Sequence, residues 1–212
     1  FWNQFLWYSE YQDRLVVGPS VSAEQGPTVN GTTYDQSIVW ELYKMAIEAS
    51  KILEVDETER KVWQEKQALL NPIIIGDEGQ VKEWFEETTL GKGKAGNLAE
   101  ANIPNFGAGG SANQGAVHRH TSQLIGLFPG TLINKDTTEW MKAAIKSLDQ
   151  RSLNGTGWSK AMKINMYART GLAEETYSMV KAMCAGNKNG IMDNLLDLSL
   201  IHISEPTRRR GI

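Results

Sequence analysis

The sequence predicts an all-α protein, because helical patterns follow one another along the chain and strand patterns are scarce. Apolar residues recur at helical spacing after Thr33, within residues 56–70, after Asp136 and through residues 158–184. No alternation of apolar and polar residues extends beyond a few positions. The segments between these helices are long, so we expect long loops at one end of the helices.

The N-terminal region combines an aromatic-rich segment with a longer one that has no period. Residues 2–13 are expected to be helical, and residues 15–31, with three glycines and two prolines, are expected to be irregular. A helix should then begin with Thr33 as its N-cap and Gln36 reaching back to complete a capping box. Its buried face should carry the apolar residues that follow at helical spacing, which are Ile38, Leu42, Met45, Ala46, Ala49 and Leu53.

The middle of the chain contains one more helix and the least regular part of the sequence. A helix is predicted over residues 56–70, because Asn71-Pro72 would end it. Residues 73–75 are expected to form a brief strand or a buried connector. Residues 76–117 show no period and include a glycine-rich run at 105–110, which by itself indicates no particular function.

Three helices are predicted in the second half of the chain. One opens at residues 136–139, and two more cover residues 158–169 and 172–184, with Gly171 and Gly186 as C-caps. The first of them should bury its apolar side, which consists of Trp140, Ala144, Ile145 and Leu148.

Length and composition limit the classes of function. A chain of 212 residues can bury one substantial core or two small ones. The net charge of −3 gives no electrostatic case for nucleic-acid binding. No stretch approaches the roughly 20 apolar residues of a membrane span. Cys184 is the single cysteine, which leaves neither an internal disulfide nor a cysteine metal cluster.

The end of the chain differs from the rest. Residues 199–212 have no helical pattern and finish near a run of three arginines. They resemble a translated sequencing adapter, so we expect residues 198–212 to be a non-native tail and residues 1–197 to carry the fold. The alternative is a solvated basic tail.

Three short motifs carry candidate chemistry, and residues 80–87 form a fourth, weaker one. Glu24 lies in an irregular loop stiffened by glycine and proline, where partial desolvation would raise its pKa and suit it to general-acid catalysis. The alternative is a solvated loop glutamate.

At residues 80–87, a core Trp84 with surface carboxylates is expected. A carbohydrate site made of Glu83 and Trp84 is the alternative.

The second motif is His118-Arg119-His120, which holds two of the three histidines of the chain. An arginine beside a histidine suits recognition of hydroxyl groups or a carboxylate. A metal site is not expected, because zinc needs three or four suitable ligands and no cysteine accompanies these histidines. The alternative is a polar cluster that caps its own loop.

The third motif, Gly155 to Lys160, is a glycine-rich turn into a helix with Trp158 in the first helical turn. The free N–H groups of that turn could face a ligand, and the indole could stack on a sugar ring. It is not a phosphate-binding loop, since the required order of glycine and lysine is absent. The alternative is a core tryptophan after a tight turn.

Taken together, these motifs resemble glycoside hydrolase family 95, the inverting 1,2-α-L-fucosidases and their relatives. The resemblance covers nearly all of residues 1–197. It is carried by PSVSAEQG (19–26), TYDQSIVWELYKMAIEASKIL (33–53), GQVKEWFEE (79–87), HRHTSQLIGLFPG (118–130), GTGWSKAMKINMYAR (155–169) and DNLLD (193–197). The blocks at 118–130 and 155–169 are the specific ones.

The resemblance implies a partial (α/α)6 toroid with loops lining a central pocket, and release of α-linked L-fucose from glycans by inversion. Glu24 would be the general acid, although Ala23 stands where the family usually has proline. Arg119 and His120 match the sugar-binding pair of the family, and His118 and Trp158 would also line the pocket. No cofactor and no metal are implied, and the partner would be a fucosylated oligosaccharide.

The resemblance also implies that half of the catalytic machinery lies outside these residues. The water-activating Asp and Asn residues of the family have no counterpart here, so we expect N- and C-terminal parts of the catalytic domain to be missing and this fragment to be inactive alone. The alternatives are an α-L-galactosidase on the same fold or a non-catalytic helical carbohydrate-binding segment. Glycan substrates favour a secreted or cell-surface enzyme by analogy.

Overall fold

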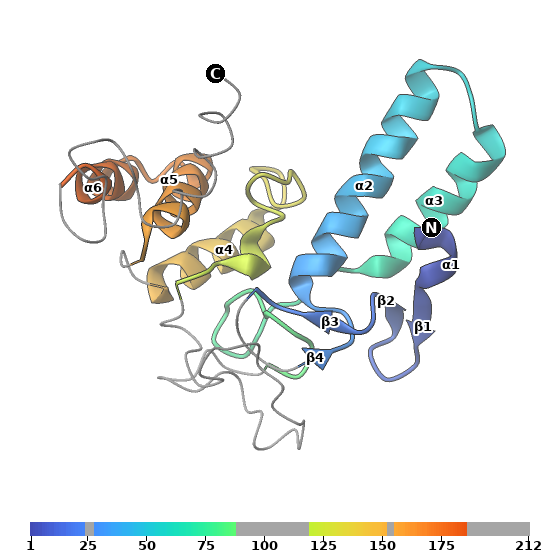
Figure 1. The fold of residues 1–212 in the computed structure, drawn as a ribbon, viewed down its shortest axis with the longest axis horizontal. Helices are drawn as coiled ribbons and strands as arrows, with labels where there is room; N and C mark the ends of the chain where they lie inside the picture. Colours follow the sequence, from blue (N-terminus) through green and yellow to red (C-terminus); the bar gives the residue numbers. More distant parts are fainter. Residues whose placement is uncertain (24–27, 88–118, 152–154, 186–212) are drawn as a thin grey trace, which may run out of the picture.

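The computed structural model describes residues 1–23, 28–87, 119–151 and 155–185. Within these residues the protein is predominantly helical, and two pairs of helices form hairpins (Figure 1). Helix α2 (Thr33–Ile52) pairs with α3 (Glu57–Leu70), α5 (Gly157–Thr170) pairs with α6 (Ala173–Met183), and α4 (Thr138–Gln150) packs against α5. The helical class is confirmed in outline, whereas the toroid stays a prediction.

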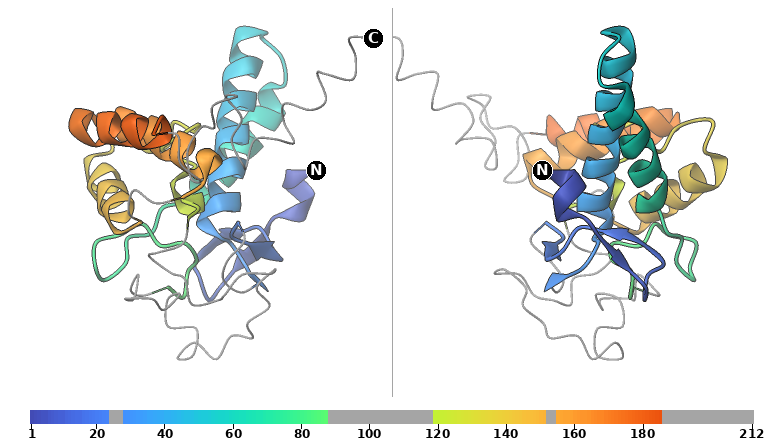
Figure 2. Two further views of the ribbon diagram at one scale, coloured as in Figure 1. Left: turned by 60° about the vertical axis from the view of Figure 1, so that its left-hand side comes forward. Right: turned by 90° about the vertical axis from the view of Figure 1, so that its right-hand side faces the viewer.

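Short strands occupy the N-terminal region. After the single turn of α1 (Trp2–Phe5), β1 (Trp7–Ser9) pairs with β2 (Arg14–Val16) in antiparallel register, with Trp7 opposite Val16. The strands β3 (Ser20–Val21) and β4 (Thr28–Val29) form a second antiparallel pair. Both pairs lie at the end of the molecule where α2 begins (Figure 2).

The helix predicted over residues 2–13 is therefore wrong beyond Phe5, and residues 15–31 are not wholly irregular. Aromatic side chains such as Trp7 and Tyr8 favour extended backbone. Asp13 adopts a positive φ of 49°, a conformation that aspartate tolerates and that turns the chain back on itself. Pairing within this short hairpin, between residues such as Trp7 and Val16, thus outweighed the local helical pattern.

Helix α2 begins one residue earlier than predicted and is capped differently. Thr32, not Thr33, is the N-cap, and its side chain accepts the N–H of Asp35 at 3.3 Å. Gln36 does not reach back to the cap but is fully buried. Its amide accepts the N–H of Val17 and donates to two main-chain carbonyls, those of Leu15 and Leu70. Gln36 thus supplies partners for buried backbone groups in and after β2 and at the end of α3.

The buried face of α2 also differs from the predicted one. Ile38 and Met45 are 40% and 58% exposed, and Leu42 and Leu53 are exposed as well. The face that packs against α3 and the N-terminal strands carries Gln36, Val39, Tyr43, Ile47 and Ser50. Both sets of residues recur at helical spacing, so periodicity alone could not decide which set faces the core.

Helix α3 ends as predicted. Its last residue, Leu70, is buried, and Asn71 follows in the left-handed conformation with φ of 36°. Ile73 is a buried connector, and Ile75 forms an isolated antiparallel bridge with Val81. Thr33 then donates hydrogen bonds to the carbonyls of Lys82 and Glu83, so the chain returns to the N-terminal end of α2 before residue 87.

The second half of the described chain has its own core. Helices α4, α5 and α6 bury Ala144, Leu148, Met166 and Met179 against the short helix η2 (Ser122–Leu124) and the loop that follows it. The prediction for the start and the inner side of α4 is confirmed in most positions, and Gly171 ends α5 with a φ of 80°. Trp40 of α2 packs against both cores.

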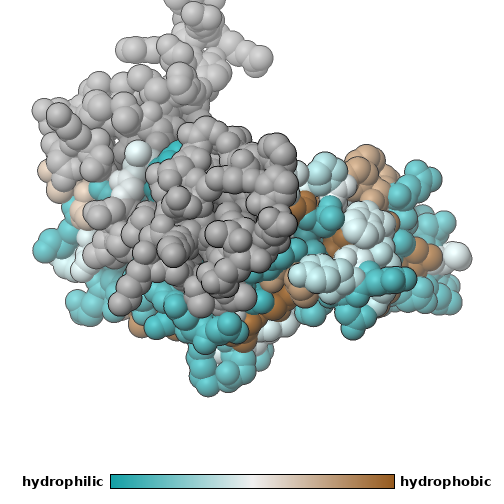
Figure 3. Space-filling view, turned by 90° about the horizontal axis from the view of Figure 1, so that it is seen from below, coloured by the Kyte–Doolittle hydropathy of each residue, from teal (hydrophilic) through white to brown (hydrophobic). Residues whose placement is uncertain are grey.

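None of the helices in the described ranges is long and apolar enough to span a bilayer. On the face seen from below, hydrophobic residues alternate with hydrophilic ones in the part that is coloured (Figure 3).

Candidate functional site

One cavity brings together segments that are far apart in the sequence. Its volume is about 220 Å³, and it lies between the end of β3, the first turn of α2, the segment around η2 and the first turns of α5. Its lining includes Ala23, Tyr34, His120, Thr121, Ser122, Ile125, Trp158, Ser159 and Met162. Two of the predicted site residues, His120 and Trp158, thus share one cavity.

Two other predicted site residues, Glu24 and His118, lie outside the described residues, as do residues 105–110, Gly186 and residues 198–212. Ala23, which lines the cavity, directly precedes Glu24 in the sequence. Arg119 directly precedes His120, which also lines the cavity.

The backbone of Arg119 is held by the first turn of α5. The hydroxyl of Ser159 donates a hydrogen bond to the carbonyl oxygen of Arg119. Gly155, just before α5, has a φ of 141°, and a Cβ at this position would lie 2.5 Å from the Ser159 hydroxyl. Glycine is therefore required here for two reasons, backbone conformation and close approach.

The imidazole of His120 is half-buried beside the cavity. Burial lowers the pKa of His120, the positive charge of Arg119 lowers it further, and Arg151 and Lys163 act in the same direction, while Glu83 opposes them. This shift favours the neutral form of the imidazole. A neutral imidazole offers one hydrogen-bond donor and one acceptor, which suits the hydroxyl groups of a sugar.

Trp158 is 45% exposed in the first turn of α5, so it is not the core tryptophan that was the alternative interpretation of this motif. Its indole lies at the wall of the cavity. An exposed indole at that position can stack on the apolar face of a sugar ring.

A buried cluster of charged residues lies close to the cavity. Glu83 and Arg151 form an ion pair of 2.6 Å, with side chains 1% and 0% exposed. Trp84 is a core residue, as expected, but the prediction of surface carboxylates around it is wrong for Glu83 and Glu87, which are both buried. The sequence near residue 83 contains no signal for this burial, because the compensating arginine is 68 residues away.

The charged groups in this cluster shift the pKa values of their neighbours. Burial and the neighbouring carboxylate of Glu83 raise the pKa of Glu87 to about 8. Burial, Arg151 and Lys160 lower the pKa of Lys163 to about 8, and its ammonium donates to the carbonyl of Arg151 at 3.3 Å. Such groups are common near functional sites, although structural ion pairs produce them too.

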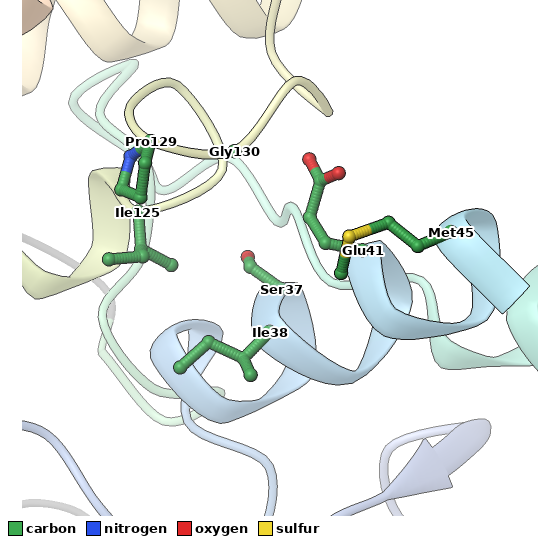
Figure 4. A pocket seen from close by; sticks show the side chains of 7 residues that line it. All are labelled: Ser37, Ile38, Glu41, Met45, Ile125, Pro129 and Gly130. Atoms are coloured by element: carbon green, nitrogen blue, oxygen red, sulfur yellow. The ribbon is translucent and has the colours of Figure 1, made fainter.

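A second cavity, of about 290 Å³, lies between α2 and the loop after η2 (Figure 4). Its walls are mostly apolar, and its one carboxylate, Glu41, accepts hydrogen bonds from the N–H groups of Thr131 and Leu132. The carboxylate therefore fixes the loop. Within the described residues, no cluster of three or more His, Cys, Asp or Glu side chains could hold a metal ion.

Comparison with known proteins identifies the family to which the chain belongs. Residues 1–202 match the family "Glycosyl hydrolase family 95 catalytic domain", so the chain belongs to this family. It is similar to "Probable alpha-fucosidase A" of Aspergillus oryzae, with 30% identity over 173 residues, and of Aspergillus niger, with 28% over 193 residues. It is also 30% identical over 151 residues to "Alpha-L-fucosidase 2" of Arabidopsis thaliana.

These matches cover 77%, 84% and 70% of the chain, but only 21%, 21% and 15% of the relatives. The chain thus spans about a fifth of the length of the curated relatives that it matches. The family predicted from the sequence motifs is confirmed.

Proposed function

We propose that the protein to which this segment belongs hydrolyses α-L-fucosides in glycans with inversion at the anomeric carbon, and that Glu24 is its general acid. The supporting observation is the cavity that Ala23, His120 and Trp158 share. These three residues come from three separate segments, and each segment carries a predicted site residue.

The roles of the residues follow from their chemistry. Glu24 would protonate the glycosidic oxygen as the bond to the anomeric carbon breaks. Arg119 and His120, with His118 beside them, would hold the sugar hydroxyls, and Trp158 would stack on the ring. Their contribution is to fix the pose of the sugar against the acid.

An inverting hydrolase also needs a base that activates water on the opposite face of the sugar, roughly 6.5–9.5 Å from the acid. We propose that this base belongs to other parts of the protein, and that these 212 residues alone release no fucose at a useful rate. The short coverage of the relatives supports this. Measurable fucose release by the purified fragment would contradict it.

The test uses the full-length protein with Glu24→Gln and, as a matched control, Glu48→Gln at an exposed position of α2. Turnover is compared on a fucosylated oligosaccharide and on dinitrophenyl α-L-fucoside, whose leaving group needs little protonation. The acid variant should lose about 100-fold or more on the oligosaccharide and little on the aryl fucoside. Equal effects on both substrates, or none, would contradict the acid assignment.

Two further measurements on the unmodified protein complete the test. Proton NMR of the first product should show β-L-fucose, since inversion of an α-linkage gives the β-anomer. Initial rates on the nitrophenyl α-L-fucoside should exceed those on the α-L-galactoside, and the reverse order would favour an α-L-galactosidase.

A further inference from the structure

The carboxylate of Glu83 joins three segments beside the cavity. Its Oε2 accepts a hydrogen bond from Nη2 of Arg151, the C-cap of α4, at 2.6 Å, and its Oε1 accepts one from the hydroxyl of Ser22. The main chain of Glu83 is also fixed. Its carbonyl accepts the N–H of Thr33 at 3.0 Å, and its own N–H donates to the carboxyl group of Glu87.

The side chains of this arrangement are buried. Ser22, Glu83 and Arg151 are each 1% exposed. Water is therefore not available to replace a lost partner, and each hydrogen bond has a larger effect on geometry than it would at the surface.

Ser22 connects this cluster to the cavity wall, because the next residue is Ala23. The preceding strand is anchored in the same way. Ser20 shares a hydrogen bond of 2.6 Å with the hydroxyl of Thr32 and donates to Asp35 at 2.7 Å. Ser20 and Ser22 are buried and Val21 between them is exposed, as expected for alternating side chains in an extended segment.

We propose that Glu83 is a positioning residue, which holds Ser22 and, through the chain, Ala23 at the wall of the cavity in place for proton transfer to the glycosidic oxygen. This inference rests on the proposed function. Glu83 does not touch the reacting atoms in this role. It acts through Ser22, with Arg151 fixing the other oxygen of its carboxylate.

The negative charge of Glu83 also acts on the other side of the site, since it opposes the lowering of the pKa of His120. A change in Ser22 alone leaves this charge and the pair with Arg151 in place, so it isolates the positioning effect.

The test compares Ser22→Ala with Ser50→Ala in the full-length protein. Ser50 is a matched control because it is also buried and accepts a hydrogen bond from a charged side chain, from Nε of Arg60 at 2.9 Å. It lies in the last turn of α2, whereas the cavity is lined by the first turn of that helix. Ser22→Ala should lower kcat on the oligosaccharide about 10- to 100-fold with KM nearly unchanged. It should leave turnover of dinitrophenyl α-L-fucoside nearly intact, and the Ser50→Ala kinetics should equal those of the unmodified protein.

Glu83→Gln and the double variant Ser22→Ala/Glu83→Gln complete the cycle. If the hydroxyl acts through Glu83, the two changes together should have less effect than the product of the single effects. The inference is overturned if Ser22→Ala resembles Ser50→Ala, or slows both substrates equally, while Glu24→Gln shows the expected dependence on the leaving group. If Glu24→Gln lacks that dependence, the proposed function itself fails and the inference fails with it.

Discussion

Glu83 and Arg151 form a fully buried ion pair with 2.6 Å between Oε2 and Nη2, although 68 residues separate them in the sequence. The pair joins the segment before residue 87 to the end of α4. It also places a fixed carboxylate next to Ser22, the residue that precedes Ala23 of the cavity wall. The fold and the candidate site therefore depend on the same contact.

Loss of the arginine should be costly. Arg151→Met leaves the carboxylate of Glu83 buried without its partner, so we expect a loss of about 3–5 kcal/mol in the free energy of unfolding. Denaturant midpoints of the full-length protein measure this. Lys142→Met is the control, because Lys142 and Glu139 form an exposed pair of similar length, 2.8 Å, and its loss should have little effect. Equal effects of the two changes would contradict the importance of the buried pair.

Glu87 should make stability depend on pH. Its pKa is raised to about 8 by burial and by the charge of Glu83, so the folded protein holds this proton more tightly than the unfolded chain does. This contribution is complete at acidic pH and is lost as the pH rises from about 4.5 to about 8. Glu87→Gln should reduce the fall in melting temperature over that range. An identical slope in the variant and the unmodified protein would show that Glu87 ionises normally.

His120 should titrate below its ordinary pKa of 6.5, because it is partly buried and lies next to Arg119. NMR of protein with labelled histidine can follow this titration directly. Arg119→Met removes the second largest cause, so the midpoint should rise but stay below 6.5, since burial remains. A midpoint at or above 6.5 in the unmodified protein would mean that the imidazole is open to water.

Gly155 should be far less tolerant of substitution than Gly171. Both have positive φ, but a Cβ at Gly155 would meet Ser159 at 2.5 Å, whereas a Cβ at Gly171 has nothing within 4 Å. Gly155→Ala should therefore displace the hydroxyl that holds Arg119 and raise KM, in addition to a loss of about 1–3 kcal/mol in stability. Gly171→Ala should cost about 1 kcal/mol and leave KM unchanged. Similar KM values for both variants would remove the link between Gly155 and the site.

Local signals predicted the ends of helices well. Asn71-Pro72 after α3 and Gly171 after α5 act through the backbone conformation of one or two residues, so the sequence nearby was sufficient. The pairing of β1 with β2 needs a turn at Asp13 that the aromatic pattern does not indicate. The buried face of α2 depends on contacts with α3 and the N-terminal strands. Their local patterns were compatible with either outcome.

The same distinction, between local signals and contacts that only the fold creates, applies to the candidate site. His120 and Trp158 were predicted from short motifs, and the cavity unites them. Glu83 was expected at the surface, because nothing near it in the sequence indicates Arg151 or Ser22 as partners. A buried carboxylate can be recognised only when the folded chain shows what compensates its charge.

The most direct test of the proposed site is a crystal structure of the full-length Glu24→Gln variant with a bound fucosylated oligosaccharide. The fucose ring should lie in the cavity against His120 and Trp158, with the amide introduced by this substitution about 2.6–3.2 Å from the glycosidic oxygen. A sugar bound elsewhere, or residue 24 far from the glycosidic oxygen of a sugar held by His120, would contradict it.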